Sequence, residues 1–104
     1  MSDTGEPSVE TVREALREVY DPELGYNIVD LGLVYGIAVE DGRVEITMTM
    51  TTPGCPAADY IEEGTRERVA MLDGVHDVAV QVVWSPPWTP DMMSDDAKRH
   101  FGFA

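Results

Sequence analysis

The sequence predicts a single two-layer domain of the α/β (α+β) class, in the order helix, strand, strand, helix, strand, with a small mixed sheet and a short C-terminal helix. Three observations lead to this prediction. Apolar residues recur at helical spacing in residues 9–20 and 58–72. Apolar and polar residues alternate beside an Asp-Gly dipeptide and again near residue 80. A chain of 104 residues is long enough for one hydrophobic core and too short for two.

The first element is expected to be an amphipathic helix. Ser8 is a suitable N-cap, and the apolar residues after it share one helical face: Val9, Val12, Leu16, Val19 and Tyr20. Pro22 disfavours helical geometry at the residue before it, so the helix should end near Tyr20. Residues 1–7 are mostly small and polar and are expected to form a flexible tail, which leaves residues 8–104 as the domain.

A hairpin is expected next. The segment 28–40 is rich in β-branched residues, and the segment 43–50 alternates between apolar and polar residues. The Asp-Gly pair at 41–42 joins them and supplies the positive φ that a two-residue turn needs, so the strands should run antiparallel. Gly32 and Gly36 interrupt the first strand, which indicates bulges or the close approach of another backbone.

A second helix and a last strand complete the expected sheet. Residues 58–72 place apolar and charged side chains on opposite faces, and the Asp-Gly pair at 73–74 ends the helix. In residues 75–84 every second residue from Val78 to Trp84 is apolar, as in a strand with one buried face. A helix that connects two parallel strands normally crosses over and packs against the sheet.

The C-terminal segment 85–104 contains three prolines and then Ser94, an N-cap for a short helix that ends at Gly102. Its aromatic and methionine side chains are too apolar for a free tail. We expect them to fold back over the core or to bury a dimer contact.

The charge of the chain limits its partners. The formal net charge is -13, and Lys98 is the only lysine. Such a negative potential repels phosphate backbones and anionic lipid, so we expect neither nucleic acid nor a membrane surface as a partner. No apolar run is long enough to span a membrane, and the first residues do not resemble a signal peptide. We therefore expect a cytoplasmic protein whose single cysteine stays reduced.

Cys55 stands between Gly54 and Pro56, where the alternating strand pattern gives way to a helical one. Proline is favoured at the first helical position, so Cys55 is expected at the N-cap, where the helix dipole lowers the thiol pKa from ~8.5. The hydroxyls of Thr51 and Thr52 lie beside the same turn and can donate to sulfur. The thiol is then a nucleophile or a metal ligand. The competing interpretation is that Cys55 is a small apolar side chain that fills a turn. The spacing of residues alone does not distinguish a reactive thiol from a turn-filling one.

A lone thiol restricts the chemistry. The sequence has no CxxC or HExxH motif, and one cysteine cannot by itself hold an iron-sulfur cluster or a structural zinc ion. Further ligands would come from a second copy, from carboxylates or from small thiols. Covalent catalysis needs a base, and the spacing places neither His76 nor His100 next to Cys55.

Three carboxylates lie in the loop after the first helix. Asp21, Glu23 and Asp30 belong to the segment DPELGYNIVD, whose simplest role is to end the helix and turn the chain. If this loop closes over the turn that holds the thiol, the carboxylates become candidate ligands.

Three segments together resemble a known family. DPELGYNIVDLGLVY, TMTTPGCP and VVWSPPWTPDMMSDDAK resemble the metal-sulfur cluster biosynthetic family of SufT-like small domains, in the same order and over residues 9–101. The resemblance implies a compact α/β domain that acts in the maturation of iron-sulfur proteins as an assembly or targeting factor. It also implies transient binding of an iron-sulfur cluster or iron, in a carrier rather than an enzyme that turns over substrate.

The resemblance also assigns residues. It makes Cys55 the functional thiol and the metal ligand, with Asp21 or Glu23 of the acidic loop beside it. Thr51 and Thr52 match the threonines that precede the family's cysteine. The other matched binding positions are Leu24, Asn27 and Asp30.

Two variants of the family bear on the partners. A branch linked to phenylacetate degradation carries a C-terminal extension with further cysteines, which this sequence lacks, so the resemblance favours a stand-alone assembly factor. Other members are fused to P-loop ATPases, and without a Walker motif here such an ATPase would be a separate partner. The expected partners are an iron-sulfur scaffold or client apoproteins. A second copy is also expected, because a single thiol and an apolar tail both favour a homodimer.

Two other classes of function stay open at this point. In the first, the chain is an adaptor subunit, phenylacetate-pathway-like or client-docking, in which residues 84–93 and the acidic surface bind a partner and the cysteine is incidental. In the second, Cys55 is the nucleophile of a thiol enzyme with a bell-shaped pH profile. A KH-type RNA-binding module has a similar order of elements, but it needs a GxxG loop and a basic surface, which this sequence lacks.

Overall fold

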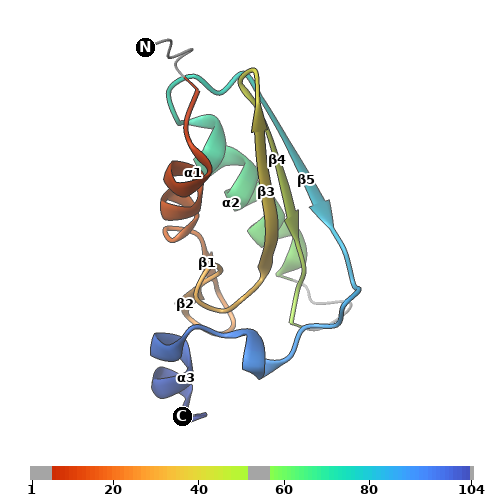
Figure 1. Cartoon of the computed structure of the whole chain (residues 1–104). Helices are drawn as coiled ribbons and strands as arrows, with labels where there is room; N and C mark the ends of the chain where they lie inside the picture. The colour runs from red at the N-terminus through yellow and green to blue at the C-terminus, as the bar shows by residue number, and fades with distance from the viewer. Residues whose placement is uncertain (1–5, 52–56, 104) are drawn as a thin grey trace.

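The computed structural model describes residues 6–51 and 57–103, and it confirms a small α+β domain (Figure 1). In chain order the elements are α1 (Val9–Leu16), β1 (Tyr20–Asp21), β2 (Tyr26–Asn27), β3 (Val34–Glu40), β4 (Arg43–Met48), α2 (Ala58–Ala70), β5 (Asp77–Val82), a 3₁₀ helix (Pro90–Met92) and α3 (Asp95–Phe101). The short antiparallel pair of β1 and β2 was not expected from the sequence. The three longer strands form one mixed sheet in the order β3-β4-β5.

α1 begins as the sequence predicts and ends earlier. The Ser8 Oγ accepts a hydrogen bond from the Thr11 N–H at 3.1 Å, which caps the helix. The expected end near Tyr20 is wrong by four residues. From Arg17 onward the backbone N–H groups donate to carbonyls three residues back, and this tighter turn releases the chain into β1.

The hairpin of β3 and β4 confirms the Asp-Gly signal. Asp41 has a φ of 53° and Gly42 a φ of 84°, so both central residues of the two-residue turn are left-handed. Glu40 pairs with Arg43 across this turn, and the strands run antiparallel. A type I′ turn of this kind matches the twist of the strands that it joins.

α2 carries the chain from β4 to β5, which runs parallel to β4 in the register Ile46–Val80. Figure 1 shows α1 and α2 on the same side of the sheet. The core lies between these two layers, and its largest side chains are at most 1 % exposed: Leu16, Ile28, Leu31, Leu33, Ile46, Met48 and Ile61. Two layers around one core is the arrangement that the sequence predicted.

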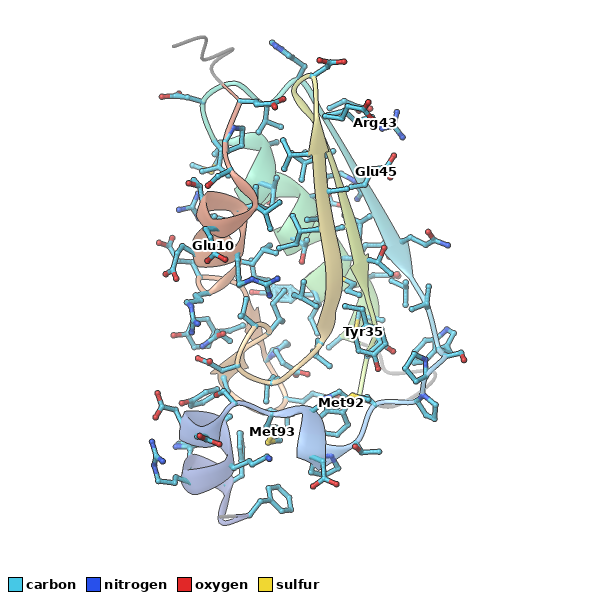
Figure 2. All side chains as sticks on the ribbon, in the orientation of Figure 1. Glu10, Tyr35, Arg43, Glu45, Met92 and Met93 are labelled. Atoms are coloured by element: carbon cyan, nitrogen blue, oxygen red, sulfur yellow. The ribbon has the colours of Figure 1, made fainter. Side chains whose placement is uncertain are left out.

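The other face of the sheet is polar. The side chains of Arg43 and Glu45 point away from α1 (Figure 2), and the Arg43 Nε lies 3.1 Å from the Glu45 Oε2. The Arg43 Nη1 also lies 3.3 Å from the Asp77 Oδ2 on β5. Solvent-exposed ion pairs of this kind contribute at most ~1 kcal/mol each to the stability of the fold. The side chains on this face are therefore hydrated rather than held in place by packing.

The segment 28–33 is not a strand, contrary to the expectation that strand structure starts at Ile28. It forms consecutive turns with buried side chains, and β3 starts only at Val34. Gly32 has a φ of +82° and lies against the backbone of Met92, which explains why a continuous strand does not form here. The predicted irregularity at Gly36 is confirmed, since the β3–β4 register shifts between Val34 and Gly36.

The C-terminal segment folds back over the domain, one of the two outcomes predicted for it. The Trp88 Nε1 donates to the Leu31 carbonyl oxygen at 2.7 Å, and the Ser94 N–H donates to the Asp30 carbonyl oxygen at 2.8 Å. Ser94 caps α3, and Gly102 ends it with a φ of 84°, as predicted. Figure 1 places α3 beside β1 and β2, at the end of the molecule far from the N-terminus.

The start of the described chain is tied to the hairpin. The Glu6 Oε1 accepts a hydrogen bond from the Gly42 N–H at 2.9 Å. Residues 1–5 of the predicted flexible tail lie outside the described residues. In the residues that the structure describes, the helices are too short or too polar to cross a membrane.

Candidate functional site

The acidic loop after β1 is built around Asp21. This residue is 1 % exposed, and its Oδ1 accepts hydrogen bonds from the backbone N–H groups of Glu23 at 2.8 Å and Leu24 at 3.3 Å. The Gly25 N–H donates to the Asp21 carbonyl oxygen at 2.7 Å, with Gly25 at a φ of +70°. Asp21 therefore shapes the turn, while the side chain of Glu23 stays exposed beside it.

Asn27 and Asp30 form a second polar group with Arg17. The Asn27 Nδ2 donates to the Asp30 Oδ2 at 2.8 Å, and the Asp30 N–H donates back to the Asn27 Oδ1 at 2.9 Å. The Arg17 Nη1 donates to both carboxylate oxygens, at 3.0 and 2.9 Å. The sequence did not predict Arg17 as a partner of Asp30.

These contacts set the charge of Asp30. Burial alone would raise the pKa of its carboxyl, but hydrogen bonds from Asn27, Ser94 and Arg17, together with the Arg17 charge, lower the pKa below its ordinary value. The hydrogen bond to Asp30 in turn raises the pKa of the Arg17 guanidinium, against the opposing effect of burial. Asp30 is thus ionised at neutral pH, with both oxygens engaged by protein donors.

The end of β4 leads toward the thiol. Thr49 is fully buried, and its Oγ1 has no hydrogen-bond partner within residues 6–51 and 57–103. Met50 is buried as well, and Thr51 is half-buried. Thr52 and Cys55, two of the predicted site residues, lie outside the described residues.

α2 begins later than the sequence predicts. Its N-cap is Ala57 and its first helical residue is Ala58, and the Ile61 N–H donates to the Ala57 carbonyl oxygen at 2.9 Å. The sequence predicted Cys55 as the N-cap and Pro56 as the first helical residue, so α2 begins two residues later than expected; Cys55 and Pro56 themselves lie outside the described residues. Proline is only statistically favoured at the first helical position. The boundary of a helix is set by the residue whose carbonyl oxygen accepts the first helical hydrogen bond. The helix dipole acts most strongly within the first turn of α2, which starts at Ala58.

An apolar groove joins the acidic loop to the end of β4. Its volume is about 380 Å³, and it is lined by Leu24, Thr51, Trp88, Pro90, Met93, Phe101 and Phe103. Two of the predicted site residues, Leu24 and Thr51, thus face the same hollow although 27 positions separate them in the sequence. The C-terminal segment supplies the other walls, with Met92 and Met93 between the sheet and α3 in Figure 2.

Sequence reasoning did not place the aromatic residues of the C-terminal segment at the site. The many aromatic and methionine residues in 84–103 predicted that this segment is buried, but they did not predict where in the fold it lies. Tyr26 fixes this segment further, because its ring lies 4.9 Å from that of His100 and 5.6 Å from that of Phe101. Such ring contacts between distant positions leave no local pattern in a sequence.

The described residues contain no group of three or more histidine, cysteine, aspartate or glutamate side chains able to hold a metal ion. Asp21, Asn27 and Asp30 each use side-chain oxygens in hydrogen bonds to protein donors. Of the predicted carboxylates in the acidic loop, Glu23 is exposed and Asp21 is buried.

A family model described as iron-sulfur cluster assembly protein matches residues 9–82. The chain belongs to this family. It is 49% identical over 94 residues to the Fe-S protein maturation auxiliary factor YitW of Bacillus subtilis, which covers 89% of this chain and 92% of the relative. It is 47% identical over 85 residues to the Fe-S protein maturation auxiliary factor SufT of Staphylococcus aureus, covering 81% of this chain and 97% of the relative.

A solved structure has a fold similar to that of this chain. A domain of unknown function, DUF59, from Bacillus anthracis superposes with a TM-score of 0.85 at 40% identity, covering 92% of each chain. The predicted resemblance to SufT-like domains and the predicted fold class are both confirmed. The roles assigned to individual residues stay predictions.

Proposed function

We propose that this protein is a cytoplasmic auxiliary factor in the maturation of iron-sulfur proteins, and that it hands on iron or an iron-sulfur cluster as cargo. The observation that carries the proposal is the similarity to two relatives named maturation auxiliary factors, at 49% and 47% identity over most of the chain. A role in iron-sulfur cluster assembly follows from this family. The partners are then an iron-sulfur scaffold or client apoproteins, with a P-loop ATPase as a separate candidate.

Cys55 is the cargo ligand in this proposal. A thiolate is the usual protein ligand of iron in such clusters, and the chain has no second cysteine. One thiol per chain leaves the other coordination positions to the donor, the client or small thiols, so the cargo is easily passed on. Thr51 and Thr52 are the hydroxyl donors that support the thiolate.

The two carboxylates of the acidic loop, Asp21 and Glu23, have different roles in this proposal. Asp21 is buried and receives two backbone N–H groups, so it holds the loop in shape. Glu23 is exposed and is the carboxylate that can reach the cargo. The common groove of Leu24 and Thr51 supports this assignment, because it brings the loop to the end of the strand that precedes the thiol.

The test is anaerobic loading with ferrous iron and sulfide, followed by gel filtration. We expect the wild type to retain iron and to show cluster absorbance, and Cys55→Ser to retain neither. Thr51→Val should slow alkylation of Cys55 near neutral pH, because it removes a donor to the thiolate. Thr47→Val removes a hydroxyl from β4, outside the residues that line the groove, and should leave the alkylation rate unchanged.

Equal retention of iron by the wild type and Cys55→Ser would overturn the ligand role. The apolar groove favours one other candidate, an adaptor that docks clients through the C-terminal segment. Phe103 is 57% exposed on the rim of that groove. Client binding that survives Cys55→Ser and is lost in Phe103→Ala would establish the adaptor in place of the carrier.

A further inference from the structure

The outer edge of β5 carries backbone groups with no partner in the described part of the chain. β5 pairs with β4 in an unbroken parallel register over its whole length, and the Val83 N–H donates to the Met48 carbonyl oxygen at 2.8 Å. In a parallel pair, successive residues of one strand point their backbone groups alternately toward the partner and away from it. Because Val83 faces β4, the outward N–H and C=O groups belong to Val78, Val80 and Val82.

The two edges of the sheet are protected to different degrees. On β3 the register shifts between Val34 and Gly36, and a bulge of this kind twists a strand and blocks further pairing. β5 has no bulge, and residues 77–82 contain no proline, glycine or lysine. Its only charged side chain is Asp77, at its first position. A regular, uncharged edge is a template for another strand.

We propose that this edge binds a second copy of the chain, with the two β5 strands antiparallel around a twofold axis at Val80. In this register the two Val80 residues exchange both backbone hydrogen bonds, and Val78 of one copy does the same with Val82 of the other. Ala79 faces Gln81 on the polar side of the sheet, so no two charged side chains are directly opposed. All the outward backbone groups of β5 are then paired. Both copies use the same surface, which makes the interface isologous.

The same register gives a place to an exposed tryptophan. Trp84 is 45% exposed and follows Val83, which is still bonded to β4. Antiparallel pairing around Val80 brings Trp84 of one copy opposite His76 of the other. A hollow of about 340 Å³ lies there, between α2 and the start of β5. It is lined by Arg66, Ala70, Val75, His76, Asp77 and Val78.

The hollow suits an indole ring. Ala70, Val75 and Val78 give it apolar walls, and the Arg66 guanidinium can stack on the face of an aromatic ring. A buried tryptophan removes roughly 150–250 Å² from solvent and is a frequent centre of binding energy. Because the interface is symmetric, each dimer seats two indoles. Six-residue strands make a small interface, below about 1,200 Å² in total, so the dimer should dissociate at micromolar concentration.

Charge distinguishes a second copy from other occupants of this edge. Each chain carries a net charge of -13, so two copies repel one another and added salt should strengthen the dimer. A basic peptide strand would be attracted by the same charge, and salt would weaken its binding. The sign of the salt effect therefore identifies the occupant.

The first experiment is sedimentation velocity on the full chain, from micromolar to millimolar concentration, in low and high sodium chloride. We expect a monomer–dimer equilibrium that shifts toward dimer at high salt. Trp84→Ala should weaken the dimer on the order of a hundredfold, because two indoles are lost per dimer. Tyr60→Ala is the matched control, since Tyr60 is an exposed aromatic on α2 that lies outside the hollow, and it should leave the equilibrium unchanged.

The second experiment tests the register by disulfide formation in a Cys55→Ser background. Residues opposed without hydrogen bonds in antiparallel strands have Cα atoms ~4.5 Å apart, within disulfide range. A mixture of Ala79→Cys chains and Gln81→Cys chains should therefore form the mixed dimer on mild oxidation. Ala38→Cys places a thiol on the same polar face of the sheet but on β3, and its mixture with Gln81→Cys should not cross-link.

Two results would overturn the proposal. The first is a wild type that stays monomeric at millimolar concentration in high salt, which would leave the β5 edge to a strand of another protein. The second is equal cross-linking by the Ala79→Cys and Ala38→Cys mixtures, which would place the contact elsewhere. Neither result depends on Cys55, so the dimer and the proposed carrier function can fail separately.

Discussion

At the scale of single residues, Asp30 connects three parts of the chain. Its carboxylate accepts hydrogen bonds from Arg17 after α1 and from Asn27 in β2, and its carbonyl oxygen accepts one from the Ser94 N–H before α3. The side chain of Asp30 is only 14% exposed, so these hydrogen bonds are partly shielded from water. Charge-assisted bonds in such surroundings contribute more than those on an open surface.

Replacing this carboxylate should destabilise the fold. We expect Asp30→Asn to lower the free energy of unfolding by about 2 kcal/mol at neutral pH, because it weakens several charge-assisted hydrogen bonds and leaves the Arg17 guanidinium with only the more exposed Glu14 as a counter-charge. Urea unfolding followed by tryptophan fluorescence measures the loss. Asp91→Asn, on an exposed position of the same C-terminal segment, is the control and should cost little.

The same pair of proteins gives a pH test. The Asp30 pKa is lowered in the folded state, so its carboxylate stabilises the fold above the unfolded-state pKa of ~3.9. That contribution is lost as the pH falls through the lower folded-state pKa. The stability difference between the wild type and Asp30→Asn should therefore shrink in acid, and a difference that stays constant with pH would contradict the assignment.

At the scale of elements, the 3₁₀ helix and the turns of 28–33 pack backbone against backbone. A Cβ atom on Gly32 would lie 2.7 Å from the Met92 carbonyl carbon and closer still to its oxygen. Real Cβ atoms do not approach backbone atoms so closely, and the φ of +82° adds strain for any L side chain. Glycine is therefore required at this crossing for two separate reasons.

A pair of glycine variants separates these two reasons. Gly25 has a φ of +70°, but a Cβ there would meet nothing within 4 Å. We expect Gly25→Ala to cost about 1 kcal/mol, from left-handed geometry alone. Gly32→Ala should cost about 3 kcal/mol and also loosen the environment of Trp88, because the Met92 backbone must move. Thermal unfolding and near-ultraviolet circular dichroism measure both effects, and equal losses would refute the crowding.

Elements fixed by neighbouring residues could be predicted from the sequence. The cap at Ser8, the hairpin turn at Asp41 and the C-terminal helix after Ser94 each depend on contacts within a few positions. The turns of 28–33 could not be predicted, because β-branched residues favoured a strand there. Only the distant Met92, packed on Gly32, shows why the chain turns instead.

The candidate site could be predicted only in part, for the same reason. The resemblance named Leu24 and Thr51, and both line the apolar groove. It could not show that Trp88 and Phe101 complete the groove, since their placement depends on ring contacts and a hydrogen bond to residues 26–31. The start of α2 was misplaced by two residues, because proline and glycine signals are less exact than the first helical hydrogen bond.

At the scale of the whole molecule, charge is unbalanced. The chain has 20 acidic side chains and 7 lysine and arginine side chains, so one-to-one pairing leaves thirteen carboxylates without a basic partner. Exposed ion pairs such as that of Arg66 and Glu62, with atoms 3.4 Å apart, contribute little each. The repulsion among the excess carboxylates is therefore the larger electrostatic term, and it opposes the compact state.

Added salt should therefore stabilise the folded chain. We expect the free energy of unfolding in urea to rise by about 1 kcal/mol from low to high sodium chloride, because screening relieves repulsion more than it weakens ion pairs. The measurement is best made on Trp84→Ala at low micromolar concentration, where self-association does not contribute. Sodium chloride is preferred to sulfate, which also strengthens apolar burial. A stability that falls as salt is added would show that the ion pairs, and not the excess of carboxylates, dominate the electrostatics of this domain.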